Sequence, residues 1–337
     1  MNNVMSTETR EETATPLSVI GCLKAGFEIV GRYLWLIAPP VLVDLLLWLG
    51  PRVSVAPVLR RFISFLTAQP TPDAVTVSQV EQAVRFLEQV SEGFNLFSFL
   101  SLLPLFNPPS LLAWRLLEAK SPLGEPSVWF APNVLAVVGW GIVLVPIGLV
   151  LGFLYLHSLA DRIRAVWPAD GSEAEGGRPG RRNSTWVKLA RLLLFVGVLL
   201  VMGITLAPLW ALVVGTCFTI APVLGFLVWS IGIGLGSYLG LHLLFVAPGV
   251  LLGDRGAWRA TWESILLIQA QFPAVVGLIL LALVLYAGLG FVWALPSADS
   301  WSLMVGIVGN SCIATGLTAA VFIFYRERIK VVQARQA

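Results

Sequence analysis

Six long apolar stretches, separated by short polar segments, dominate this sequence. They cover residues 33–51, 130–157, 190–213, 223–251, 273–295 and 303–325. Most match or exceed the ~20 residues that a helix needs to cross a hydrocarbon core of about 30 Å. The apolar residues run continuously rather than in alternation, which excludes the strands of a membrane β-barrel. The pattern predicts an all-α polytopic membrane protein, built as a six-span helical bundle.

Two amphipathic stretches each precede an apolar one, and both predict a helix on the inner membrane surface. In residues 16–51 an interfacial helix leads into the first span, with Thr15 as its cap and Pro16 at its first position. The second interfacial helix covers residues 255–271. Apolar side chains recur at intervals of three and four in both stretches: Ile20, Leu23, Phe27, Val30 and Leu34, then Trp258, Trp262, Ile265, Ile268 and Phe272.

Residues 52–128 form the one sizeable segment expected outside the spans, a small helical outer subdomain. It contains FNLFSFLSLLPLFNPPSLLAW, residues 94–114, whose apolar run is too short to cross a membrane and ends in prolines. We expect a re-entrant or interfacial lid there, and the sequence leaves open whether it spans instead. Spans 2 to 6 then fill residues 129–326. The polar residues 1–15, the Gly-rich loop 168–185 and residues 327–337 predict disordered or tail segments.

This layout resembles that of uncharacterised bacterial multi-pass membrane proteins. It is also similar to the membrane domain attached to some glycerophosphodiester phosphodiesterases. The resemblance rests on inner interfacial helices alternating with spans and on LFSFLSLLPLFNPPSLLAW between spans. It implies no catalytic residue in this chain, because the catalytic barrel of those enzymes is a separate domain.

Composition supports the membrane class, and charge sets the expected orientation. Hydrophobic residues make up 57% of the 337 residues and charged residues 12%, against about 25% charged in soluble domains. Of the 22 lysines and arginines, six lie in residues 52–128 and the other sixteen in segments expected to be cytoplasmic. The positive-inside rule then predicts a cell-membrane protein with both termini in the cytoplasm. A net charge of +3 gives no reason to expect nucleic acid as a partner.

Asp44 is the most unusual residue of the apolar stretches, because an acid inside the bilayer is costly and is by default a functional hypothesis. Counting 1.5 Å per residue from the inner ends of the spans puts it at the depth of His242 and Thr315. We therefore predict an intramembrane polar cluster in which Asp44 contacts His242 or the polar groups Asn310, Ser311 and Thr315. Alternatives are a carboxylate that reaches outward to Arg52, a protonated acid bonded to a backbone carbonyl, and a transport or proton role.

Three glycines repeat every four residues in WSIGIGLGSYLG, namely Gly232, Gly236 and Gly240. On a helix this spacing makes one smooth face, on which a second helix can approach closely. We predict a helix-packing face. A nucleotide-binding glycine loop is excluded, since neither the preceding strand nor the following acid is present.

Catalytic and metal motifs are missing from the sequence. Cys22, Cys217 and Cys312 have neither disulfide nor metal spacing, and nothing predicts a cofactor. We expect a non-enzymatic membrane component, whether transporter-like, accessory or membrane-organising, with lipid and other membrane subunits as partners. The alternative is an intramembrane enzyme acting on a lipid. A cavity that opens sideways to lipid, with Asp44 and Arg115 facing it, would favour the enzyme, and a sealed bundle the structural role.

Overall fold

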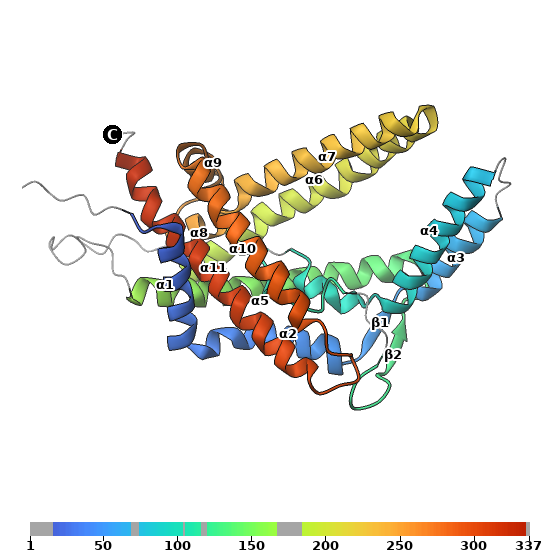
Figure 1. Ribbon diagram of the computed structural model, residues 1–337, viewed down its shortest axis with the longest axis horizontal. Coiled ribbons are helices and arrows are strands. Elements are labelled where there is room, and N and C mark those ends of the chain that lie inside the picture. The colour runs from blue at the N-terminus through green and yellow to red at the C-terminus, as the bar shows by residue number, and fades with distance from the viewer. Residues whose placement is uncertain (1–15, 69–73, 104, 116–119, 167–183, 335–337) are drawn as a thin grey trace, which may run out of the picture.

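The computed structural model describes residues 16–68, 74–103, 105–115, 120–166 and 184–334. The chain is almost entirely helical there (Figure 1). Its helices are α1 Val19–Arg32, η1 Leu34–Ile37, α2 Ala38–Leu49, α3 Ala56–Thr67, α4 Ala74–Gly93, η2 Leu96–Ser101, α5 Val134–Val166, α6 Thr185–Ile220, α7 Pro222–Leu243, α8 Val246–Leu251, α9 Ala257–Ala270, α10 Phe272–Trp293 and α11 Leu303–Ala334. Two short strands, β1 Arg52–Ser54 and β2 Val128–Phe130, pair in parallel.

Five segments are long and apolar enough to cross a membrane: α5, α6, α7 with α8, α10 and α11. A sixth candidate is α1 followed by η1 and α2, whose axes meet at 98°. These segments agree with the predicted apolar stretches. The helix α11 continues beyond the predicted end of the last apolar stretch at residue 325, to Ala334, through part of the expected tail. Residues 1–15 and most of the predicted loop 168–185 lie outside the described residues.

The packing of α1 differs from its predicted hydrophobic stripe. Ser18 caps the helix, with its side chain accepting from the Gly21 N–H, and the predicted Thr15 cap lies outside the described residues. Ile20 of the stripe is 72% exposed, whereas Cys22 is fully buried. A side chain at Gly26 would collide with the backbone of α11, 2.4 Å from the Gly316 carbonyl oxygen. The buried face of α1 therefore combines small residues, which allow this close backbone approach, with Leu23 and Val30 of the predicted stripe, which are 6% and 4% exposed.

The main core lies between α1, α5, α8, α9 and α11. Its largest fully buried side chains are aromatic or aliphatic and include Phe153, Tyr155, Leu159, Ile163, Phe245, Phe322 and Phe324. The pair α6 and α7 projects from this core as a long hairpin, and α3 with α4 projects as a second one (Figure 1). Only 17% of the most apolar part of α6 and 6% of that of α7 and α8 is buried. Such exposed apolar helices fit a lipid environment rather than water.

The segment from η2 to Arg115 lies inside the bundle rather than on its surface. Leu96, Leu100, Phe106 and Leu112 are all at most 4% exposed. The segment packs along α5 as far as Gly152, about 27 Å from the start of that helix at 1.5 Å per residue. A side chain on Gly152 would meet the Phe106 carbonyl oxygen at 1.9 Å. We keep the name re-entrant segment for this buried stretch, residues 96–103 and 105–115, after the lid predicted there.

Candidate functional site

Asp44 ties α2 to the re-entrant segment. Its side chain is fully buried and accepts hydrogen bonds from the Ser110 hydroxyl, from the Leu111 N–H at 2.9 Å and from the Leu112 N–H at 3.0 Å. All three partners are donors, so the group acts as an acceptor carboxylate. The Ser110 Oγ in turn accepts from the N–H groups of Leu112, at 3.2 Å, and Ala113, at 2.9 Å. Asp44 and Ser110 together fold the chain into a tight turn beside α2.

The predicted partners of Asp44 lie elsewhere. His242 is paired through Nδ1 with the Tyr238 carbonyl, 2.8 Å away on its own helix. Ser311 donates to the Ile307 carbonyl at 2.8 Å, and Thr315 accepts from the Tyr155 hydroxyl at 3.2 Å. None of the hydrogen bonds described for Asp44 involves these residues. The prediction of an Asp44–His242 contact is therefore wrong. The predicted depths of Asp44 and His242 took account of two spans alone. The carboxylate of Asp44 is instead bound by backbone N–H groups of the re-entrant segment.

Asn310 likewise takes no part in the hydrogen bonds described for Asp44. It is 1% exposed, and its Nδ2 has no hydrogen-bond partner among the described residues. The predicted cluster of Asp44, His242, Asn310, Ser311 and Thr315 is thus not assembled into one hydrogen-bonded group. Thr315 instead links α11 to α5 through Tyr155.

The predicted glycine face of α7 makes close contact at one position. A side chain on Gly232 would lie 2.5 Å from the Trp210 indole nitrogen, so α6 and α7 do approach closely there. Side chains on Gly236 and Gly240 would meet nothing within 4 Å. Two glycines of α5 lie equally close or closer to backbone atoms of the re-entrant segment: a side chain on Gly148 would lie 2.5 Å from the Leu100 carbonyl oxygen, and one on Gly152 would lie 1.9 Å from the Phe106 carbonyl oxygen. Gly148 and Gly152 are also four residues apart, so the sequence contained the same indication of close helix packing here as on α7.

A cavity of about 340 Å³ lies next to the Ser110 turn. Its walls come from α5, α8, α10, α11 and the re-entrant segment. The lining includes Tyr155, Leu156, Ala247, Pro248, Leu278, Ala282, Ala314, Leu317, Val321 and Phe322, together with Ser101, Asn107, Ser110, Tyr286 and Thr318. Trp114 and Leu283, which also line it, are 64% and 57% exposed. The cavity therefore reaches the surface of the bundle between α10 and the re-entrant segment.

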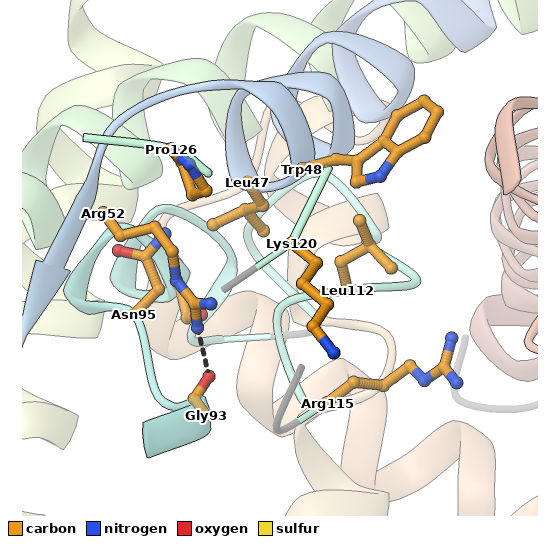
Figure 2. Close-up of a pocket in the computed structure, with 10 residues that line it drawn as sticks. Leu47, Trp48, Arg52, Gly93, Asn95, Leu112, Arg115, Lys120 and Pro126 are labelled. Atoms are coloured by element: carbon orange, nitrogen blue, oxygen red, sulfur yellow. Dashed lines mark hydrogen bonds between the residues drawn. The ribbon is translucent and has the colours of Figure 1, made fainter. Parts of the chain in front are cut away.

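Asp44 and Arg115 do not line this cavity, although Ser110 does. Arg115 lies instead beside a second, much smaller pocket at the β1 end of α2, with Arg52, Asn95 and Lys120 (Figure 2). The volume of this second pocket is about 20 Å³, enough for roughly one water molecule. There the Arg52 guanidinium donates to the Gly93 carbonyl at 2.7 Å, and the Arg115 guanidinium donates to the Ala294 carbonyl at 2.8 Å. Burial lowers the pKa of both arginines.

Metal binding has no support in the described part of the chain, where no group of three His, Cys, Asp or Glu side chains comes together. The three cysteines are free there as well. The chemistry that the described site offers is a large apolar volume with a few hydroxyl and amide groups on its walls. Such a volume suits an apolar ligand held by shape and burial.

Comparisons with known proteins assign no family to this chain. No protein-family model, no curated protein and no solved structure matches it. The function is therefore argued from the residues of the site.

Proposed function

We propose that this chain is a non-enzymatic membrane protein that holds the tail of a lipid in the cavity beside the Ser110 turn. The observation that carries the proposal is the cavity itself, about 340 Å³ in volume and lined mainly by apolar side chains. Its size is within the range of small-molecule sites. Its surface opening between Trp114 and Leu283 would let a lipid tail enter sideways from the bilayer. A transporter-like or membrane-organising role fits such a site.

The proposal includes the membrane arrangement predicted from the sequence. The chain would cross the cell membrane six times, with α1 and α9 on the inner surface and both termini in the cytoplasm. The 98° bend between α1 and α2 and the exposed Trp258 and Trp262 of α9 support surface helices. Single cysteines at Arg60 and Arg259, in a chain without its natural cysteines, test this orientation. A membrane-impermeant maleimide should label position 60 from outside and position 259 only after lysis; the reverse pattern would refute it.

Lipid binding is tested by filling the cavity. Ala282→Trp places a bulky ring on a half-buried wall of α10, whereas Val284→Trp on the same helix changes an exposed residue that does not line the cavity. A tail-labelled photoreactive lipid should crosslink to the wild type and to the Val284 variant, and much less to the Ala282 variant. Equal crosslinking of both variants at equal folded yield would contradict the proposal.

An intramembrane lipid enzyme is the second candidate, and Ser110 favours it. Ser110 lines the cavity, and its hydroxyl donates a hydrogen bond to the carboxylate of Asp44. This contact resembles that between a nucleophile and its general base. Against this, the Ser110 Oγ already accepts two backbone N–H groups, so both its lone pairs are engaged. The non-enzymatic function is therefore preferred. Turnover of an ester lipid by the wild type, abolished in Ser110→Ala, would reverse this preference.

A further inference from the structure

The chemistry of the cavity wall constrains which lipid can occupy it. None of the described residues that line the cavity is charged. A charged headgroup drawn into such a volume would lose its hydration without gaining a counterion, which is strongly unfavourable. Any polar group that enters with the tail must therefore be neutral.

Asn107 supplies an unsatisfied acceptor on this wall. It lies in the re-entrant segment and is only 2% exposed. Its Nδ2 donates to the Leu100 carbonyl at 2.8 Å, while its Oδ1 is buried with no hydrogen-bond partner among the described residues. The amide cannot exchange its two ends, because Oδ1 would then face the Leu100 carbonyl oxygen, which is also an acceptor. A donor brought by a ligand would therefore satisfy the free acceptor position of Asn107.

Tyr286 provides a second polar group on the wall. It lies on α10, and its hydroxyl reaches the Ser110 carbonyl only at 3.5 Å, the long limit of a hydrogen bond. The side chain of Asn310 also hydrogen-bonds to this hydroxyl. Because a hydroxyl donates one hydrogen bond and accepts two, Tyr286 can still accept one from a ligand O–H. Other hydroxyls on the wall have closer partners: Ser101 donates to the Pro108 carbonyl at 2.6 Å and Thr318 to the Ala314 carbonyl at 2.8 Å.

We propose that the ligand is a neutral lipid with a free hydroxyl, such as a long-chain alcohol or an acylglycerol, whose O–H donates to the Oδ1 of Asn107. This inference rests on the proposed function, since it names the class of lipid that the same cavity holds. The tail fills the apolar volume between α5, α10 and α11. The hydroxyl completes the hydrogen bonding of the Asn107 side chain. Phosphate and carboxylate headgroups are excluded from the interior by the uncharged wall.

Three probes with the same C18 tail test the inference: oleyl alcohol, its methyl ether and oleate. The ether lacks the O–H donor and carries one extra methyl group, and the wild type should bind the alcohol about tenfold more tightly, as expected for one buried hydrogen bond. Oleate should bind more weakly than the alcohol. Affinities are measured by competition with the photoreactive lipid in neutral detergent.

Variants then assign the preference to Asn107. Asn107→Leu should lower the alcohol-to-ether ratio to about one, while Thr318→Val, on the same wall, should leave it unchanged. If Asn107→Leu does not fold, the ratio of the wild type alone decides. Equal affinities for alcohol and ether would overturn this inference and leave tail binding intact. Failure of all three probes to compete would refute the proposed function as well.

Discussion

The contact between Asp44 and the re-entrant segment leads to a specific prediction for Asp44→Ala. The side chain is fully buried and accepts three hydrogen bonds. Truncation removes this acceptor and leaves the N–H groups of Leu111 and Leu112 buried without it. The Leu112 N–H keeps only its longer contact with the Ser110 Oγ, at 3.2 Å.

The expected loss of unfolding free energy follows from two opposing contributions. Hydrogen bonds to a charged group contribute about 1.5–3 kcal/mol each, and a buried donor left unpaired costs about 1–3 kcal/mol. Against this, removing the carboxylate also removes the cost of burying a charge, which amounts to several kcal/mol. The net destabilisation should be about 2–4 kcal/mol. Asp44→Ala should also release the re-entrant segment, since α2 would no longer hold the Ser110 turn.

Unfolding of the purified protein in mixed micelles with increasing SDS measures this loss. Asp299→Ala is the matched control, because Asp299 is an exposed acid in the loop before α11. Hydrogen exchange of residues 105–115 reports the local effect. The double variant Asp44→Ala with Ser110→Ala should lose less than the sum of the single losses, because both residues belong to one network. Equal unfolding midpoints for the Asp44 and Asp299 variants would refute a structural role for Asp44.

Two further substitutions test the packing of the bundle. Gly152→Leu should destabilise the protein by about 2–3 kcal/mol, because a side chain there collides with the Phe106 carbonyl. Gly236→Leu, with open space around it, should change stability by less than about 0.5 kcal/mol; the opposite order in SDS unfolding would contradict the contacts. Lys188→Met should cost about 1–3 kcal/mol, since Lys188 is 1% exposed and pairs with Asp254 at 2.5 Å. Lys24→Met, an exposed control, should be nearly neutral in the same assay.

The helices that are long and apolar enough to cross a membrane could be predicted from the sequence, because length and continuous hydrophobicity determine them locally. The α9 segment was also predicted closely, at 255–271 against Ala257–Ala270. Arg259 and Glu263 in this helix, four residues apart, form an ion pair at 3.3 Å, as that spacing favours. In these segments, hydropathy and charge spacing along one helix were enough.

The candidate site could not be predicted because its contacts join residues distant in sequence. Asp44 bonds to a turn 66 residues later, and although the lid containing that turn was predicted, neither hydropathy nor depth along a span indicates that the two residues meet. One signal was available: FNPPS places Asn107 and Ser110 within an apolar run, which is unusual unless those polar groups have partners. The Gly148 and Gly152 pair on α5 was a second signal, with the same four-residue spacing as the glycines of α7.

The central claim is that the cavity between α5, α10, α11 and the re-entrant segment holds a lipid tail. Its most direct test is to crosslink a tail-labelled photoreactive lipid to the protein in native membranes and to map the modified peptides by mass spectrometry. We predict modification concentrated in residues 105–114, 278–286 and 314–322. Labelling spread evenly over the exposed faces of α6 and α7, with none in those three segments, would contradict the account.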